Sequence, residues 1–168
     1  VRKFKTMTVY IEACESGSIF DGLLRPDLGI FVTTAANPTE SSYGTYCPGQ
    51  KNPPPPKYGT CLGDLYSVSF LENADTVDLR KESLLAQYRL VKRRTSANHT
   101  YREGSHVMRY GEKDIDTKEA SDFMGRGNKG GNIPEAEATT SKKQQQQKET
   151  EEDNTEKKDT TTTELEII

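Results

Sequence analysis

The sequence predicts an α/β fold that begins with a parallel strand–helix–strand unit. Residues 6–14 are rich in β-branched and aromatic side chains, which favours a buried strand. Residues 29–34 predict a second short strand, and the segment between the strands predicts a short helix from Ser18 to Leu24. Two strands joined by a crossover of this kind are parallel. In parallel sheets, functional sites lie at the carboxyl ends of the strands.

Loops and helices follow the second strand. Residues 37–63 are predicted as a loop, and four successive prolines at 53–56 favour a stiff polyproline II segment within it. Three helices are then expected, over residues 62–71, 79–93 and 117–124. In the second of these helices Leu84, Tyr88 and Val91 fall on one face, which is the pattern of a helix packed against a core.

Residues 126–168 differ in composition from the rest of the chain. They contain a glutamine run at 144–147 and a threonine run at 160–163, and no aromatic residue follows Phe123. Such a segment cannot bury enough apolar surface to offset the entropy lost on ordering. We therefore expect one domain over residues 1–125 and a disordered, low-complexity tail after it.

Charge and hydrophobicity exclude two classes of partner. The chain has 23 basic and 26 acidic residues, and a net charge of −3, with no basic stripe. Nucleic acid is therefore not an expected partner. The longest apolar runs, such as residues 29–36, are too short to span a bilayer, so no membrane segment is expected.

The three cysteines, being odd in number, predict one bonded pair and one free thiol. Cys14 lies at the predicted carboxyl end of the first strand, before a turn with Gly17 and before the predicted helix. A helix N-terminus favours a thiolate, and the backbone N–H of Cys14 is placed to stabilise an oxyanion. Judged by spacing alone, a buried and unreactive cysteine is the commoner outcome.

The residues around Cys14 favour the reactive interpretation. The string from Tyr10 to Ser18, YIEACESGS, resembles the nucleophile segment of the legumains, the asparaginyl endopeptidases known in plants as vacuolar processing enzymes. The resemblance covers about residues 1–125 and implies the C-terminal part of a catalytic domain with a caspase-like three-layer α/β sandwich. The transamidase that attaches glycolipid anchors is an alternative relative, although its cysteine is followed by a different string. The other matching strings lie at residues 33–38, 40–43, 62–68, 87–88 with 90–92, and 105–108 with 110–111.

The resemblance implies that the Cys14 thiolate attacks the carbonyl group after an asparagine of a protein substrate. In the family the histidine that takes the cysteine proton comes from an earlier strand. The two histidines here, His99 and His106, both follow Cys14, and His106 matches a position outside the catalytic set. We therefore expect a truncated catalytic domain that is inactive alone. A non-catalytic fragment or pseudoenzyme is the alternative.

Several residues resemble the family's pocket for the P1 side chain. Glu12 and Asp64 match its acids, Ser42 matches a hydroxyl, and Ser41 is a weaker match. Carboxylates accept hydrogen bonds from the amide NH₂ of an asparagine. The arginine for the carbonyl end of that amide has no match in the chain. The expected substrates are polypeptides with asparagine, or protonated aspartate, at P1, and Glu12, Ser42 and Asp64 are expected to converge beside Cys14.

The resemblance to plant members implies a disulfide between Cys47 and Cys61, on either side of the polyproline loop. Two unpaired thiols are the alternative. Zinc is not expected, because no second pair of ligands follows at a usable spacing, and no cofactor is implied. The loop resembles one that, in plant members, influences the balance between hydrolysis and peptide ligation. A surface loop without that role is equally compatible with the sequence.

Residues 98–100, Asn-His-Thr, form an acceptor sequence for N-glycosylation at Asn98. A family that carries disulfides and glycans passes through the secretory pathway. The resemblance therefore implies that the protein resides in a vacuole or in a lysosome-like acidic compartment.

Overall fold

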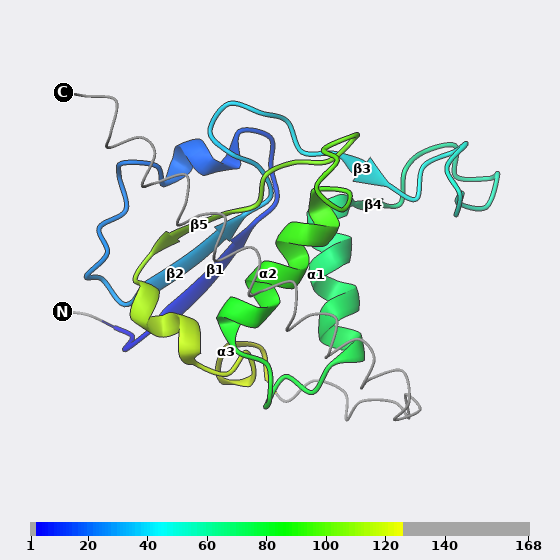
Figure 1. Ribbon diagram of the computed structural model, residues 1–168. Coiled ribbons are helices and arrows are strands. Elements are labelled where there is room, and N and C mark those ends of the chain that lie inside the picture. The colour runs from blue at the N-terminus through cyan, green and yellow to red at the C-terminus, as the bar shows by residue number, and fades with distance from the viewer. Residues whose placement is uncertain (1–2, 126–168) are drawn as a thin grey trace, which may run out of the picture. The chain divides into compact units, whose positions relative to one another are not determined.

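The computed structural model describes residues 3–125, which form a mixed α/β fold (Figure 1). Its central sheet has the strand order β1-β2-β5. The strands are β1 (Met7–Ile11), β2 (Ile30–Thr34) and β5 (Met108–Gly111). β1 and β2 run parallel, which confirms that part of the prediction, whereas β5 runs antiparallel to β2 on its other side. The predicted tail, residues 126–168, lies outside the described residues.

The predicted helix from Ser18 to Leu24 is wrong. A single 3₁₀ turn, η1 (Ser16–Ile19), takes its place and is followed by hydrogen-bonded turns. Gly22 has φ +68° and interrupts any right-handed helix there. A four-residue 3₁₀ turn has no helix dipole comparable to that of a long α-helix, so the expected thiolate stabilisation by a helix N-terminus is not available to Cys14.

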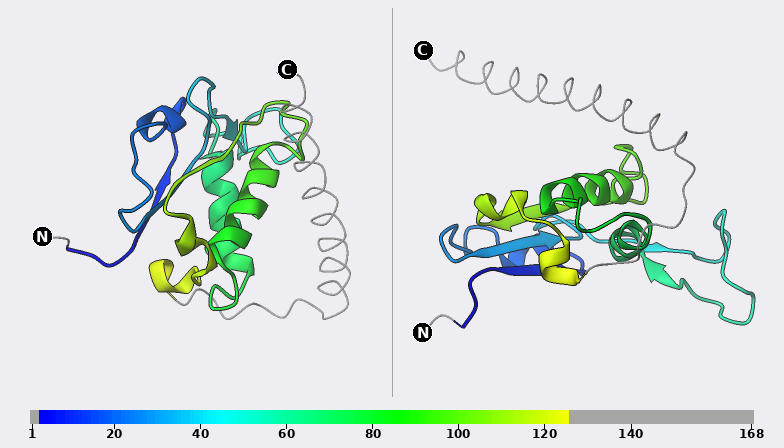
Figure 2. Two further views of the ribbon diagram at one scale, coloured as in Figure 1. Left: turned by 60° about the vertical axis from the view of Figure 1, so that its left-hand side comes forward. Right: turned by 90° about the horizontal axis from the view of Figure 1, so that it is seen from below.

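Two α-helices lie side by side against one face of the sheet (Figure 2). They are α1 (Leu65–Thr76) and α2 (Leu84–Thr95). The α2 helix begins later than predicted because the Ser83 hydroxyl caps it, accepting the Ala86 N–H at 3.1 Å. Two core clusters join helices and sheet: Phe31 packs with Leu79, Leu84, Ile115 and Ala120, and Ala35 packs with Tyr66, Val91 and Val107.

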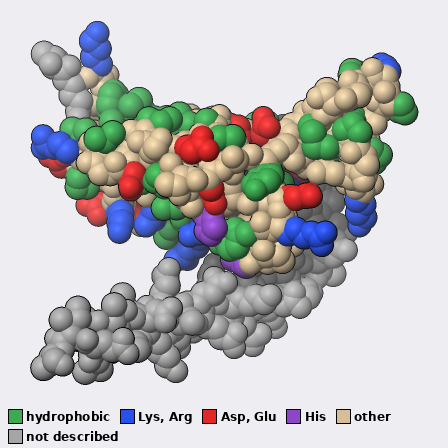
Figure 3. Space-filling view, turned by 90° about the horizontal axis from the view of Figure 1, so that it is seen from above, with side chains coloured by type: hydrophobic (Ala, Val, Ile, Leu, Met, Phe, Trp, Pro, Cys, Tyr) green, Lys and Arg blue, Asp and Glu red, His purple; other side chains and the backbone are tan. Residues whose placement is uncertain are grey.

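Shorter elements complete the fold. Strands β3 (Gly44–Thr45) and β4 (Gly63–Asp64) form a two-stranded antiparallel ladder. The loop between them extends from the body, and we call its residues 47–61 the arm. Figure 3 shows the arm in profile. Near the end of the described chain lie a 3₁₀ turn, η2 (Lys113–Thr117), and the single-turn helix α3 (Ser121–Met124), where one helix over 117–124 was predicted. None of the helices within residues 3–125 has the length and apolar character to cross a bilayer.

Candidate active site

Cys14 lies just beyond the carboxyl end of β1 and is a free, exposed cysteine. Its Sγ lies 3.8 Å from the Ser42 hydroxyl oxygen and 3.9 Å from the Ser42 carbonyl oxygen. Ser42 belongs to the loop that follows β2, so the two parallel strands bring both residues to one edge of the sheet. The thiol is accessible to a ligand and has a hydroxyl group beside it.

The nucleophile loop, which we define as residues 14–17, is attached to the segment after β2 by hydrogen bonds. The Glu15 N–H donates to the Glu40 carbonyl at 2.7 Å, and the Gly17 N–H donates to the Ala36 carbonyl at 3.0 Å. The Ala36 N–H in turn donates to the Ser16 hydroxyl at 3.1 Å. These bonds fix the loop, and hence the thiol, relative to the second strand.

Glu12 is a half-buried carboxylate between β1 and the first turn of α1. Its Oε2 accepts both the N–H and the hydroxyl of Ser67 at 2.9 Å. Burial raises the pKa of Glu12; the Ser67 bonds oppose this change, and the negative charge of Asp64 adds to it. The Ser42 hydroxyl also acts on this carboxylate. The Asp64 charge and the Ser42 hydroxyl thus both act on Glu12, and Ser42 lies beside Cys14. Convergence of all three residues on one pocket stays a prediction.

Asp64 ends β4 and directly precedes α1. It pairs with Gly44 in the β3–β4 ladder, and the adjacent Leu65 N–H donates to the Tyr43 carbonyl at 2.8 Å. Ser41 is exposed, and within residues 3–125 its side chain makes no hydrogen bond to the other members of the group. Its predicted role in the pocket stays a prediction.

Ser67 is a member of this group that the sequence analysis missed. It lies within one of the matching strings, but only the fold shows that its N–H and hydroxyl bind Glu12. The N–H belongs to the first turn of α1, where backbone donors have no partner inside the helix. Glu12, directly after β1, therefore caps this helix from a distant part of the chain.

Neither histidine is hydrogen-bonded to the Cys14 sulfur within residues 3–125. The His106 ring Nδ1 lies 2.8 Å from the Glu40 carboxylate, and the ring stacks on Tyr101 with 3.7 Å between ring centroids. His99 is exposed and lies in the loop after α2, where its φ is +64°. Among residues 3–125, the hydrogen bonds of the Cys14 sulfur go to Ser42 and to neither histidine.

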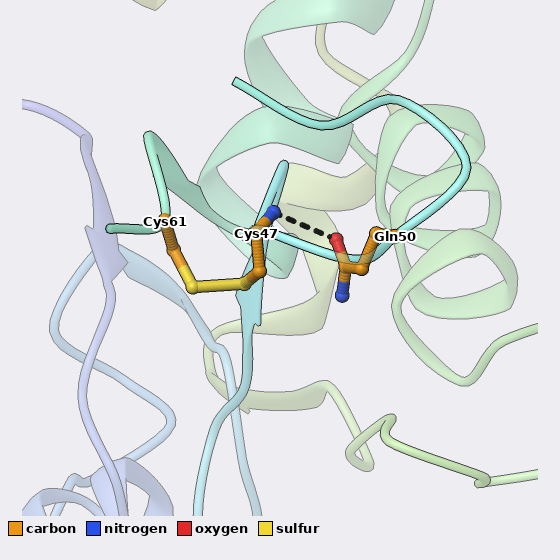
Figure 4. The surroundings of a disulfide bond; sticks show 3 residues. All are labelled: Cys47, Gln50 and Cys61. Atoms are coloured by element: carbon orange, nitrogen blue, oxygen red, sulfur yellow. Dashed lines mark hydrogen bonds between the residues drawn. A yellow bond between two sulfur atoms is a disulfide. The ribbon is translucent and has the colours of Figure 1, made fainter. Parts of the chain in front are cut away.

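Cys47 and Cys61 form a disulfide at the base of the arm (Figure 4). The Cys47 N–H also donates to the Gln50 side chain at 2.9 Å. Next to the disulfide, the Tyr46 hydroxyl binds Glu72 of α1, and Arg94 of α2 pairs with the same carboxylate. The two ends of the arm are thereby joined covalently and attached to both helices.

Asn98 is exposed in the loop after α2, in a left-handed conformation with φ 57°. Thr100, the other required residue of the acceptor sequence, is also exposed. An oligosaccharide on Asn98 remains a prediction, and the exposed position leaves space for one.

The free Cys14 thiol lies beyond the carboxyl end of a strand in an α/β sheet, with the Ser42 hydroxyl beside it. The sequence model of the peptidase C13 family matches residues 1–126. The chain belongs to the peptidase C13 family.

Curated relatives agree with this assignment. Legumain from Canavalia ensiformis is 57% identical over 112 residues, covering 67% of this chain and 24% of that protein. Vacuolar-processing enzyme beta-isozyme from Arabidopsis thaliana is 52% identical over 131 residues, covering 78% and 27%. Vacuolar-processing enzyme from Ricinus communis is 50% identical over 135 residues, covering 80% and 27%. The chain thus spans about a quarter of the length of these relatives.

The raised pKa of Glu12 predicts a loss of stability as pH rises. A carboxyl group that is harder to ionise when folded binds its proton more tightly in the folded state, so its contribution falls as pH rises from the unfolded pKa through the folded pKa. Between pH 4 and pH 7, the melting temperature of Glu12→Gln should therefore fall less than that of the wild type. Thermal unfolding followed by circular dichroism measures this difference.

Glu72→Gln supplies a control of opposite sign, because hydrogen bonds from Tyr46 and Arg94 lower the pKa of Glu72. Glu72 contributes stability above its unfolded pKa and loses it as pH falls. The control should therefore be destabilised at pH 7, and this destabilisation should shrink only as pH falls below about 4.5 towards the lowered folded pKa. Equal pH dependence of the wild type and Glu12→Gln would contradict the assignment of Glu12 as a half-buried, destabilised carboxylate.

Gly17→Ala should disturb the nucleophile loop. An added Cβ would lie 2.8 Å from Pro38 N, 2.9 Å from Asn37 C and 2.6 Å from the Tyr110 hydroxyl oxygen. Two of these atoms belong to the backbone and cannot rotate away, so the loop must shift, at a cost of about 1–3 kcal/mol. Urea unfolding should show this loss, and amide exchange should accelerate at residues 15–17.

Gly22→Ala is the matched control for this prediction. It lies in the same segment and nothing lies within 4 Å of its added Cβ, but its φ of +68° is strained for alanine. We expect a loss of about 1 kcal/mol without faster exchange at residues 15–17. If both variants affect these residues equally, close packing under Gly17 is not what holds the loop.

Proposed function

We propose that the chain carries the nucleophile of a cysteine endopeptidase that cleaves polypeptides after asparagine, and after aspartate when that side chain is protonated. The observation that supports this most directly is the exposed Cys14 thiol, 3.8 Å from the Ser42 hydroxyl and next to the half-buried Glu12. Family membership and relatives named legumain and vacuolar-processing enzyme support the same activity.

In the proposed reaction, the Cys14 thiolate attacks the carbonyl carbon after the P1 residue. The C–N bond of the resulting tetrahedral intermediate breaks, the amine leaves with a proton, and a thioester with the enzyme remains. Water then hydrolyses the thioester and restores the thiol. An incoming amine in place of water would give peptide ligation, and the arm of residues 47–61 is the segment proposed to influence that balance.

The pocket next to Cys14 is proposed to bind an asparagine side chain through its amide NH₂ group. The Glu12 and Asp64 carboxylates accept hydrogen bonds, and the Ser42 hydroxyl can both donate and accept. One oxygen of Glu12, Oε1, is buried and has no hydrogen-bond partner among the described residues. A ligand amide at this position would supply a donor, whereas an apolar P1 side chain would leave polar groups unpaired.

The complete protein is proposed to form the full three-layer caspase-like sandwich, with further strands beside β1, which is an edge strand in the described sheet. Those strands would carry the histidine base. The disulfide and the exposed Asn98 site fit a protein of the secretory pathway, and a vacuolar or lysosome-like compartment is proposed from the names of the relatives.

A second candidate is a non-catalytic fragment that binds asparaginyl peptides without cleaving them. The observation in its favour is that the Cys14 sulfur hydrogen-bonds with Ser42 and not with His99 or His106 within residues 3–125. Both candidates use the same pocket, and they differ in whether a proton acceptor for Cys14 is present. The alternative of a glycolipid-anchor transamidase relative lacks a comparable observation.

An electrophilic peptide tests the proposed pocket without requiring turnover. A peptidyl chloromethyl ketone with asparagine at P1 alkylates a thiolate with loss of chloride, so no leaving amine has to be protonated. We expect it to label Cys14 about tenfold faster than the same probe with leucine at P1, because leucine leaves the carboxylates unpaired. Intact-protein and peptide mass spectrometry give the site and the rate of labelling.

Two control variants distinguish the contribution of the pocket to labelling from that of the thiol. Cys14→Ala should show no labelling at this site, and Glu12→Gln should label with a reduced preference for asparagine. Equal rates for the asparagine and leucine probes in the wild type would reject asparagine selectivity. Labelling confined to other residues would reject Cys14 as the reactive thiol.

A further inference from the structure

The nucleophile loop adopts a backbone conformation that requires support from its surroundings. Glu15, directly after Cys14, has φ 49° and ψ 22°, the left-handed region that side chains other than glycine rarely occupy. Such conformations persist only where neighbouring structure enforces them. The Glu15 carbonyl accepts the Ser18 N–H at 2.8 Å in a local turn, and the Glu15 N–H donates to the Glu40 carbonyl at 2.7 Å, which is its backbone contact with a distant segment.

The Glu40 side chain fixes the segment that carries this carbonyl. Its Oε1 accepts the Asn37 N–H at 2.9 Å, which closes the turn of residues 37–40 upon itself. The same oxygen accepts the His106 N–H at 2.7 Å, and Oε2 lies 2.8 Å from the His106 Nδ1. One carboxylate therefore joins the turn after β2 to the segment before β5, while the backbone of the same residue holds Glu15.

His106, the partner of the Glu40 side chain, is itself held in place. The His106 ring stacks on Tyr101 at 3.7 Å with an interplanar angle of 12°, and the neighbouring Ser105 hydroxyl donates to the Ala35 carbonyl at 2.6 Å. Burial raises the pKa of Glu40, but hydrogen bonds from Asn37 and His106 outweigh burial and hold that pKa below its usual value. The carboxylate is thus held as an ionised acceptor between two ordered segments.

We propose that Glu40 is a positioning residue for the nucleophile, which holds the Cys14–Glu15 backbone through its own carbonyl while His106 fixes its side chain. Ser42, two residues farther along, is the neighbour of the Cys14 sulfur, so a displaced Glu40 would move both the thiol and the pocket hydroxyl. The importance of this role for catalysis depends on the proposed function. The geometry of the nucleophile loop is independent of that function.

The chemistry of the carboxylate defines a conservative replacement. Glutamine at position 40 retains a carbonyl oxygen for the two backbone N–H groups of Asn37 and His106. Its NH₂ can donate to the His106 Nδ1 when the histidine is neutral with its proton on Nε2. Glu40→Gln should therefore keep the turn closed, whereas Glu40→Ala removes every side-chain acceptor.

Amide hydrogen exchange on the 168-residue chain tests the proposal. In Glu40→Ala, exchange of the Glu15 amide should accelerate on the order of tenfold relative to amides of β2, because its acceptor is no longer held in place. In Glu40→Gln, it should stay close to the wild-type rate. Glu112→Ala is the matched control: its carboxylate also accepts a backbone N–H, that of Gly29 at 2.6 Å, but near the opposite ends of β1 and β2. It should leave Glu15 unchanged.

Three results would overturn the proposal: unchanged Glu15 exchange in folded Glu40→Ala, equal effects of alanine and glutamine, or the same Glu15 effect in Glu112→Ala. If Glu40→Ala does not fold, His106→Ala decides, since loss of the ring contact should still accelerate Glu15 exchange several-fold; no change there rejects the role. The asparagine chloromethyl ketone gives an independent readout. Wild-type protein without asparagine preference would reject the proposed function and leave the exchange result intact.

Discussion

The 168-residue chain should not turn over an asparaginyl peptide, even though its Cys14 thiol is exposed and should react with alkylating probes. Peptide cleavage needs a group that takes the thiol proton and then protonates the leaving amine, a contribution of about 10²–10⁴-fold in rate. His106 is stacked on Tyr101 and directed to Glu40, and the hydrogen bonds that the Cys14 sulfur makes within residues 3–125 go to Ser42 and to neither histidine.

A fluorogenic peptide with asparagine at P1, assayed at about pH 5 beside Cys14→Ala, provides the measurement. We expect the wild type and the alanine variant to give the same background, while iodoacetamide still modifies Cys14 in the wild type. Adding His106→Ala tests whether that ring contributes at all. Robust turnover that disappears in Cys14→Ala would falsify the claim that the base lies outside this chain.

Local sequence signals predicted the parallel strand pair from its β-branched residues and α2 from its periodic apolar face. The helix predicted over 62–71 exists but runs from Leu65 to Thr76. Leu84 and Val91 on the predicted face of α2 are both buried. The boundaries depend on capping: α2 starts after Ser83, and Leu79, although part of the core, lies in a turn before it. Periodicity alone does not distinguish a buried turn residue from the first residue of a helix.

The missed elements depend on contacts between distant segments. β5 is four residues long and is stabilised by antiparallel pairing with β2, so its short Met-Arg-Tyr-Gly string carries little local signal. The wrong helix after Cys14 has a different cause: Glu15 and Gly22 both have positive φ, which apolar spacing does not reveal. Asn or Gly positions mark such conformations more often than glutamate does.

The resemblance predicted Cys14, Glu12, Ser42 and Asp64, whereas the contacts of Ser67 and Glu40 came from the fold. The strings containing Glu12, Ser42 and Asp64 are far apart in the sequence. In the fold Ser42 lies beside Cys14 and Glu12 binds the first turn of α1, while their convergence with Asp64 on one pocket stays a prediction. Glu40 belongs to one of those strings, yet nothing in the sequence assigned it a role. Its side chain bonds to His106 across 66 positions, a relation visible only in three dimensions.

The arm between β3 and β4 should depend strongly on its disulfide. Cys47 and Cys61 are separated by 14 positions, and between them the arm contains no β-ladder. In the chain-entropy model, closing a loop of this size contributes about 3 kcal/mol, mainly by restricting the unfolded chain. The free energy of unfolding of the double variant Cys47→Ala/Cys61→Ala, measured by urea denaturation, should therefore be lower by about that amount. Dithiothreitol should have a similar effect on the wild type.

Cys14→Ala is the control for thiol loss, and it should leave the urea midpoint nearly unchanged because Cys14 is exposed and forms no disulfide. The base of the arm should stay attached in the double variant, since Tyr46 and Arg94 hold Glu72 without the disulfide. Amide exchange should therefore accelerate within residues 48–60 and stay slow in α1. A double variant as stable as the wild type would mean that the base contacts alone restrict the arm, and that loop closure contributes little.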